Sequence, residues 1–411
     1  MREVDALNLS KGWKEVSLAE ISTKIGDGLH GTPKYDDSGK YYFINGNNLG
    51  NGKIYIYPTT NRISQSEYEK IKKELNDRTI LLGINGTIGN LGFYNDEKVA
   101  LGKSACYINL KNDVDKHYIR YVLEFDHFQN YAQLFATGST IRNLGLKAIR
   151  NYKFFLPPLE TQRKITSILS GYDDLIENNL KRIKILEEMA QQTYEEWFVR
   201  MRFPGYETAV MNEETGLPEG WEKVKLGEKI EVGRGSSPRP IADKKYFENG
   251  TIPWLKIADA TASKIYIYKT KEYVNDYGAS FSRKLPIGSL ILAASGTLGF
   301  PMFLGVEACI HDGWIYFKGV EDDLKECFYF SFIGLKRYFD GIAYGAAIQN
   351  INTTILRESP LIVPDIDTLK NFKIIASGAL DTIVNLQQQN QRLREARDLL
   401  LPRLMMGIVE V

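Results

Sequence analysis

The chain has 411 residues, of which 43% are hydrophobic and 25% are charged. This composition is typical of a globular protein with two or three domains and excludes a disordered chain. Lys and Arg number 52 and Asp and Glu 51, so the net charge of +1 lacks the basic excess that usually marks a nucleic-acid-binding protein. Any function on nucleic acid must therefore depend on segregated charge.

The cysteines and the N-terminus indicate a cytoplasmic protein. Cys106, Cys309 and Cys327 are too few and too scattered for a disulfide framework or a metal site, and they fit buried thiols in a reducing compartment. The first residues lack the apolar segment of a signal peptide. No stretch approaches the ~18 apolar residues of a membrane span, so we expect no membrane association.

The sequence contains two copies of one module. Four motifs recur in the same order, 207 to 210 residues apart. The pairs are Gly12-Trp13 and Gly220-Trp221, Ile80–Gly89 and Leu290–Gly299, Gly138–Leu144 and Gly345–Ile351, and Leu156–Leu159 and Val363–Ile366. Two copies are too few for a solenoid. They predict a pseudo-twofold repeat that performs one binding task twice.

Short apolar runs open each copy and predict strands, because clusters of Gly, Asn and Pro separate them. These runs include Tyr41–Ile44, Ile54–Tyr57, Ile80–Leu82 and Ile291–Ala293. A helical part follows each β-rich part, at about residues 160–201 and 367–406. Ser-Gly pairs at residues 170–171 and 377–378 interrupt these helical parts, and we expect each pair to end a short helix before a long one.

Heptad spacing makes the long helices amphipathic. The apolar positions are Ile176, Ile183, Ala190 and Trp197, and then Leu386, Leu393 and Leu400. Such helices pack on their own globular domain, form a dimerisation arm, or pair with each other. We favour an antiparallel intramolecular pair, because the polar run Gln387–Asn390 would weaken a free coiled-coil dimer.

Several segments resemble specificity subunits of type I restriction-modification enzymes. The segment Pro240–Ala260, with Tyr246-Phe247, Gly250 and Ile252-Pro253-Trp254, resembles a target-recognition domain of that family, as does Ala294–Gly299. The segment Leu156–Ile165 is similar to the start of the family's central helical region, and Leu400–Gly407 is similar to its C-terminal end. Residues 43–49 follow the pattern of the second domain only loosely.

The resemblance implies an α+β fold with two β-rich target-recognition domains separated by two long antiparallel helices. The expected divisions are residues 1–158, a central helical region at 159–202, a linker and second recognition domain at 203–365, and a C-terminal helical region at 366–411. Each domain would read one half of a split site in double-stranded DNA. Two modification (methyltransferase) subunits would dock on the helices, and restriction subunits would join them. S-adenosylmethionine, ATP and magnesium would act on those partners, and this chain would bind no cofactor.

A search for catalytic motifs supports a non-catalytic chain. Pro157-Pro158 is followed by Leu159, so it lacks the aromatic residue of a methyltransferase motif. No phosphate loop occurs, and Val232–Gly235 is an isolated GxG. The four histidines, at positions 30, 117, 127 and 311, show no ligand spacing. His30 could contact phosphate or stand in a turn.

In the second copy, the DNA-binding candidates lie in a glycine-rich segment and after Trp254. The segment supplies Arg234, Ser236, Ser237 and Arg239, whose side chains can contact bases or phosphates. Lys256 can donate to guanine and Asp259 can accept from cytosine N4. A solvated turn and a surface ion pair are the alternative interpretations. Thr297 and Gln349 complete the set.

In the first copy, the corresponding candidates are short polar side chains. They are Thr32, Lys34, Asn45, Asn47, Asn48, Thr87 and Arg142. Asn can pair with adenine but is equally at home in turns. A basic run follows Arg142 and provides segregated charge; it consists of Lys147, Arg150, Lys153, Arg163 and Lys164. A solvated face is the other interpretation of this run.

Two other functional classes remain open at the level of sequence. One is a self-sufficient methyltransferase or nuclease with divergent motifs, which a turnover assay on the purified chain would reveal. The other is a structural coiled-coil adaptor, which salt-dependent DNA binding would argue against.

Overall fold

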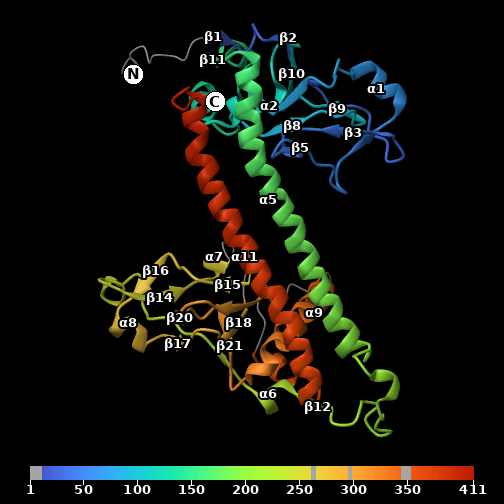
Figure 1. The fold of residues 1–411 in the computed structure, drawn as a ribbon, viewed down its shortest axis with the longest axis vertical. Coiled ribbons are helices and arrows are strands. Elements are labelled where there is room, and N and C mark those ends of the chain that lie inside the picture. Colours follow the sequence, from blue (N-terminus) through green and yellow to red (C-terminus); the bar gives the residue numbers. More distant parts are fainter. Residues whose placement is uncertain (1–11, 261–264, 295–298, 344–352) are drawn as a thin grey trace. The chain divides into compact units, whose positions relative to one another are not determined.

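The computed structural model describes residues 12–260, 265–294, 299–343 and 353–411 (Figure 1). Thr297 and Gln349 lie outside these residues. The chain forms two compact units, and each contains part of both long helices. The first unit comprises residues 1–176 and 391–411, and the second comprises residues 177–390.

The central sheet of the first unit has the strand order β2-β10-β7-β8, and its neighbours are antiparallel. Its strands are β2 (Ser22–Asp27), β7 (Thr79–Gly83), β8 (Leu91–Phe93) and β10 (Ala105–Leu110). Every residue of β7 and β10 is buried, which is why these segments read as continuous apolar runs.

Three smaller sheets complete the strands of the first unit. One has the order β6-β3-β9, with β3 and β9 parallel. The strands are β1 (Lys14–Ser17), β3 (Tyr41–Ile44), β4 (Leu49–Gly50), β5 (Lys53–Ile54), β6 (Arg62–Ile63), β9 (Val99–Leu101) and β11 (Lys153–Leu156). The strand expected at residues 54–57 is wrong beyond Ile54, because the large side chains that follow it are exposed and do not pack in the core.

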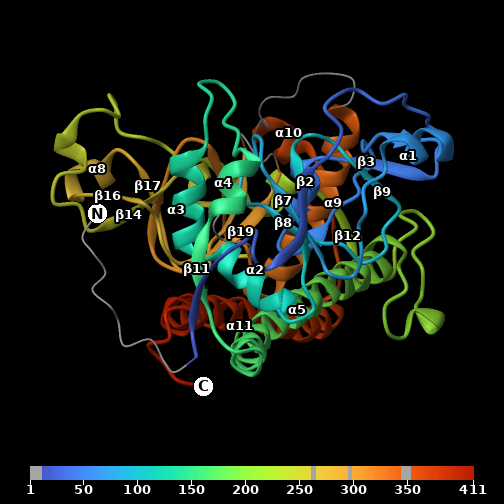
Figure 2. The same cartoon turned by 90° about the horizontal axis from the view of Figure 1, so that it is seen from above.

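Short helices cover the first unit's core. They are α1 (Gln65–Ile71), α2 (Lys116–Glu124), α3 (Asp126–Phe135) and α4 (Leu146–Asn151), with a 3-10 turn at Gly46–Asn48. Figure 2 shows α3 beside α4, and the Tyr131 hydroxyl donates to the carbonyl of Ala148 across this contact at 2.9 Å.

The second unit has a five-stranded sheet in the order β13-β21-β18-β19-β15 and a four-stranded sheet in the order β16-β14-β20-β17. The first sheet consists of β13 (Glu231–Arg234), β15 (Tyr266–Ile267), β18 (Leu290–Ala293), β19 (Pro301–Leu304) and β21 (Trp314–Lys318). The second consists of β14 (Ile252–Leu255), β16 (Glu272–Val274), β17 (Arg283–Leu285) and β20 (Ala308–Ile310).

The remaining elements of the second unit lie around these sheets. β12 (Glu222–Lys225) pairs with β22 (Pro360–Val363). The short helices are α6 (Leu226–Lys229), α7 (Ile257–Ala260), α8 (Asp276–Ser280) and α10 (Thr353–Glu358), and α9 (Lys325–Ala343) is longer, with 19 residues. Turns of 3-10 helix lie at Tyr206–Thr208, Lys244–Tyr246 and Asp322–Leu324.

The predicted repeat is confirmed in the main sheet and in the parallel strand pair of each unit. The order β2-β10-β7-β8 corresponds to β13-β21-β18-β19, and the parallel pair β3–β9 corresponds to β14–β20. A side-chain hydrogen bond to the first strand of the main sheet is also duplicated. Arg150 donates to the carbonyl of Ile25 at 2.8 Å, and Arg357 donates to that of Val232 at 2.6 Å. In both copies, the residue before the motif Trp is a glycine with positive φ (Gly12 at 100° and Gly220 at 83°), a conformation that disfavours other residues.

The two long helices are continuous. α5 runs from Leu159 to Tyr194 and is followed by a π-helical turn at Glu195–Val199, and α11 runs from Ile366 to Met405. The expectation that the Ser-Gly pairs end a short helix is wrong. Ser170 and Ser377 instead bond to carbonyls of their own helices, and the apolar residues on both sides are buried, which outweighs the helix cost of about 1 kcal/mol for each glycine.

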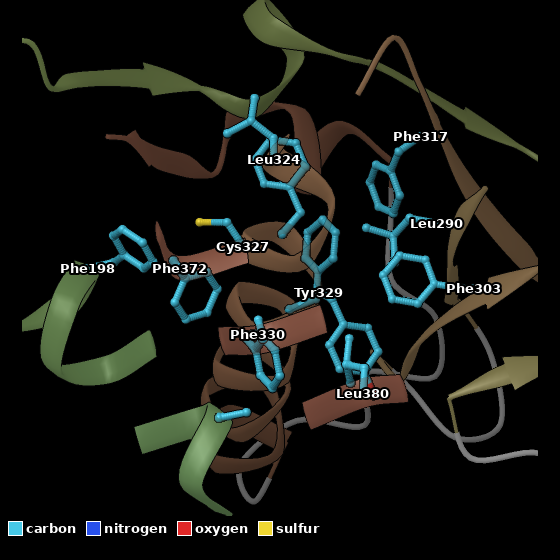
Figure 3. Close-up of a cluster of buried hydrophobic side chains, with 14 of the residues drawn as sticks. Phe198, Leu290, Phe303, Phe317, Leu324, Cys327, Tyr329, Phe330, Phe372 and Leu380 are labelled. Carbon is cyan, nitrogen blue, oxygen red and sulfur yellow. The ribbon is translucent and has the colours of Figure 1, made fainter. Parts of the chain in front are cut away.

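In the second unit, α5 and α11 pack antiparallel. Asn179 contacts Asn390 at one level and Trp197 contacts Phe372 at another, so the two helices run in opposite directions. Figure 3 shows Phe198, Phe330 and Phe372 gathered in the aromatic core that joins these helices to α9. The heptad residues Ile183, Ala190 and Trp197 lie in this core, as predicted from their spacing.

In the first unit, the helices contribute an apolar contact and a charged one. Ile165 and Leu169 of α5 share a core with Leu404 and Met405 of α11. One helical turn beyond Leu169, the carboxylate of Asp173 accepts from the Tyr121 hydroxyl at 2.8 Å and from Arg397 at 2.6 Å, and it lies 3.2 Å from Arg120. This network ties α2 to both long helices.

Replacing Asp173 with Asn is expected to destabilise the first unit by about 2 kcal/mol, because two arginines lose their shared, largely buried partner. The free energy of unfolding, measured by urea denaturation, tests this. Glu160→Gln is the matched control, since Glu160 forms an exposed pair with Arg163 and its loss is expected to change stability by less than about 0.5 kcal/mol. Equal stability of the two variants would contradict a structural role for the network.

Candidate nucleic-acid interface

The same backbone corner occurs once in each unit, where the first strand of the main sheet ends. In the first unit, the amides of Gly28 and Leu29 donate to the carbonyls of Ala105 and Leu101. In the second unit, the amides of Gly235 and Ser236 donate to those of Trp314 and Ile310. A Cβ on Gly28 would lie 2.1 Å from the carbonyl oxygen of Leu101, and one on Gly235 would lie 2.2 Å from that of His311, so only glycine fits at either corner.

In the second unit, three predicted DNA-binding residues converge on Asp312, which precedes β21. Arg234 Nε donates to the backbone carbonyl of Asp312 at 2.7 Å. Ser237 Oγ donates to Asp312 Oδ1 at 3.2 Å, and Arg239 forms an ion pair with Oδ2. Ser236 instead bonds to the carbonyl of Phe281 at 3.0 Å. The structure thus gathers two exposed arginines around one aspartate, Arg234 on its backbone carbonyl and Arg239 on its carboxylate.

Lys256 adjoins this cluster through two rings. Its ammonium lies 5.0 Å from the centre of the Trp254 ring, whose edge contacts His311, and it also pairs with Glu272. Burial lowers the pKa of His311; nearby cations, including Lys256, lower it further, and Asp312 opposes them. A mostly neutral imidazole therefore lies among cations.

Asn48 and Asp259 occupy equivalent positions and have the same structural role. Asn48 Oδ1 accepts from the amide of Asn45 at 3.0 Å, and Asp259 Oδ2 accepts from the amide of Lys256 at 2.9 Å. Both residues are 5% exposed, and each has a further partner on the segment that follows its turn: Asn48 donates to the carbonyl of Tyr55 at 2.8 Å, and Asp259 accepts from the amide of Lys271 at 3.1 Å. We therefore assign Asn48 and Asp259 to holding the turns in shape, and leave Asn45 and Lys256 as the accessible members.

In the first unit, Asn45 borders the loop that precedes β10. Its Oδ1 accepts from Ser104 Oγ at 2.9 Å, and Ser104 Oγ also accepts from the amide of Gly46 at 3.0 Å. Asn47 is exposed at the surface of the same turn. Asn45 is thus fixed next to Lys103, an exposed basic residue at the tip of that loop.

A polar pocket of about 240 Å³ opens beside this loop. It is lined by Asp27, His30, Asn85, Lys103 and Asn143, together with the segment from Leu144 to Leu146 and Ile84. Asp27 Oδ2 lies 2.6 Å from His30 Nε2. Every polar group here can exchange hydrogen bonds with a base or phosphate.

Other predicted residues of the first unit lie around the same region. Arg142 is exposed, and Gln133 Oε1 accepts from its Nη1 at 3.0 Å. Thr87 Oγ1 is buried and has no hydrogen-bond partner among the described residues. Thr32 and Lys34 are exposed on the loop after β2, and the backbone amide of Lys34 donates to Glu67.

The basic run after Arg142 does not form one free surface. Arg150 supports β2 as described above, Lys153 pairs with Glu15 on the neighbouring strand, and Arg163 pairs with Glu160. Glu160 stands within the run in the sequence, but the partner of Lys153 could not be found there, because Glu15 lies 138 residues before it.

The structure adds Asp27, Lys103 and Asp312 to the residues selected from sequence. The repeat could have identified them, since Asp27 stands 207 residues before Arg234 and Lys103 stands 209 before Asp312. Chemically, the two corners offer hydrogen-bond donors and acceptors that suit recognition. In the described part of the chain, no group of His, Cys, Asp and Glu side chains is arranged to hold a metal ion.

Comparison with solved structures supports this architecture. The chain matches a type I restriction-modification S subunit from M. genitalium with a TM-score of 0.61 at 16% identity, covering 97% of this chain and 96% of that one. It also matches a chain from a structure of type I restriction-modification complex assembly with a TM-score of 0.50 at 14% identity, covering 98% and 100%.

Sequence comparison identifies relatives over the same length. The chain is 26% identical to the type I restriction enzyme MjaIX specificity subunit of Methanocaldococcus jannaschii, over all of this chain and 96% of that protein. It is 23% identical to the HindI specificity subunit of Haemophilus influenzae, over 69% and 74%. Residues 10–188 and 218–395 each match the type I restriction modification DNA specificity domain. The chain therefore belongs to the family of type I restriction-modification specificity subunits.

Proposed function

We propose that each unit of this non-catalytic subunit reads one half of a bipartite site in double-stranded DNA. The observation that carries the proposal is the duplication of one corner with different side chains. The backbone geometry is the same in both units, whereas the exposed groups differ, as two readers of different sequences require. Specificity for DNA follows from the family, and the division into half-sites follows from the repeat.

The long helices set the length of the unread gap in this proposal. α5 has 36 residues and α11 has 40. At 1.5 Å per residue these helices are roughly 54 and 60 Å long, compared with about 34 Å for one turn of DNA. Helices that are continuous and paired are stiff enough to hold a fixed spacing.

Two modification subunits dock on the helices, and restriction subunits join through them. Each unit exposes an equivalent pair of apolar side chains on its helical segments or directly after them: Ile168 and Met406 in the first, and Ile375 and Val199 in the second. Ile168 and Ile375 are both 37% exposed. Exposed apolar groups that recur with the repeat suit two identical partners.

The chemistry belongs to these partners and takes place in the cytoplasm. S-adenosylmethionine, ATP and magnesium act on the modification and restriction subunits, and this chain supplies the recognition of the DNA sequence. Among the helices of the described residues, none has the length and apolar character needed to cross a bilayer.

Changing the accessible residue of one turn is expected to alter one half-site only. Lys256→Gln should weaken recognition in the second unit's half, and Asn45→Ala in the first unit's half, by about 1–3 kcal/mol if each residue contacts a base edge. Methylation-site mapping of the reconstituted complex measures both halves at once. A single substitution that changed the bases read in both halves would exclude two independent readers.

Charging one apolar surface is expected to remove one modification subunit. Native mass spectrometry of the reconstituted complex should show two modification subunits per chain, and one for Ile168→Asp or Ile375→Asp, because a carboxylate would be desolvated in the contact. Ile287→Asp is the control, since Ile287 is 68% exposed in the loop before β18 and belongs to neither long helix. Two modification subunits on each helix variant at saturation would contradict this surface.

A further inference from the structure

Charges are exchanged between the two equivalent corners. Position 27 in the first unit is an aspartate and its equivalent in the second is Arg234, whereas position 103 is a lysine and its equivalent is Asp312. Each corner thus presents one acidic and one basic side chain on the same backbone geometry. One of the two comes from the end of the strand and the other from the facing loop. The signs are reversed between the units.

Neither corner uses its basic group to neutralise the acid at the other position. Arg234 donates to the backbone carbonyl of Asp312, while the carboxylate is held by Ser237 and Arg239. Asp27 is bonded to His30. A fold that needed only an ion pair between the two positions would join the charged ends, so the exchange indicates a role other than support.

The side chains remain reachable from solvent. Lys103 and Arg234 are exposed, and the side chains of Asp27 and Asp312 are 22% and 35% exposed. A carboxylate accepts about four hydrogen bonds. Asp312 therefore keeps acceptor capacity beyond its bonds to Ser237 and Arg239.

An acidic side chain beside a basic side chain matches one DNA base pair in particular. In the major groove, guanine presents two acceptors, N7 and O6, and its partner cytosine presents the N4 donor. We propose that each corner reads one G·C base pair, with Lys103 or Arg234 on guanine and Asp27 or Asp312 on cytosine. Because the signs are exchanged, the guanine lies on opposite strands in the two half-sites when they are aligned by the repeat.

This inference rests on the proposed function, and site mapping of the reconstituted complex tests the two separately. The complex of the chain with its modification subunits is incubated with a random DNA library and S-adenosylmethionine, and methylated sequences are read. A contiguous or single-part site would overturn the proposed function. A bipartite site without a G·C pair in each half would overturn only the proposal that each corner reads a G·C base pair.

Single substitutions then locate the contact. Arg234→Gln and Asp312→Asn are expected to lower the preference for G·C roughly tenfold at one position of the second half, and Lys103→Gln is expected to do so in the first half. Lys229→Gln, which removes an exposed base near β12, is the control and should leave both halves unchanged. Equal weakening on all sequences would assign these side chains to phosphates and overturn the proposal.

A charge-exchanged variant covers the case in which one substitution disturbs folding. The double variant Arg234→Asp with Asp312→Arg restores one acid and one base at the corner of the second unit. It is expected to methylate sites in which that G·C pair is reversed to C·G. An unchanged orientation in a variant with the thermal stability of the unmodified chain would overturn the proposal.

Discussion

Each unit depends on both long helices to close its hydrophobic core. The first unit buries Ile165 of α5 against the cluster that contains Leu404 of α11, and the second buries Ile183 of α5 with Leu380 of α11. Neither core is therefore made from one continuous stretch of chain. The first part of α5 and the last part of α11 belong to the first unit, and the last part of α5 and the first part of α11 belong to the second, so helices that pair in both units must run antiparallel.

Buried polar contacts fix how these helices align. Asn179 and Asn390, 7% and 1% exposed, bond to each other in the second unit at 3.0 Å. A polar pair in an apolar seam costs stability but penalises a shift in register, because a shift would leave both amides unsatisfied. The Asp173 network fixes the alignment of the first unit with charges, so the two halves of one repeat use different chemistry for the same purpose.

The fold could be predicted largely from sequence because a duplication displays its own organisation. The repeat follows from the spacing of the four motifs, the antiparallel helix pair is the favoured one of three interpretations of the heptad pattern, and the α+β class is implied by the family resemblance. The structure confirms all three. The prediction that the Ser-Gly pairs end a helix was wrong, because the helix propensity of one residue contributes less free energy than the burial of apolar side chains on both sides of Gly171 and Gly378. The prediction of a strand over Ile54–Tyr57 was wrong beyond Ile54, because a short apolar run does not reveal whether its side chains face a core.

The candidate site was only partly predictable. Asn45 and Lys256 lie at accessible turns, but sequence could not separate them from Asn48 and Asp259, whose roles depend on backbone amides three residues away. Asp312 was missed because its importance comes from Arg234 and Arg239, more than 70 residues earlier in the chain.

The central claim is that one duplicated module gives two separate readers. The most direct test is the methylation motif produced when this chain is expressed with its modification subunit, mapped genome-wide. Our account predicts two defined half-sequences separated by a fixed unread gap, and a longer gap with the same half-sequences when one heptad is added within residues 176–191 together with a matching insertion in α11. A single contiguous motif, or half-sequences that change with the insertion, would contradict it.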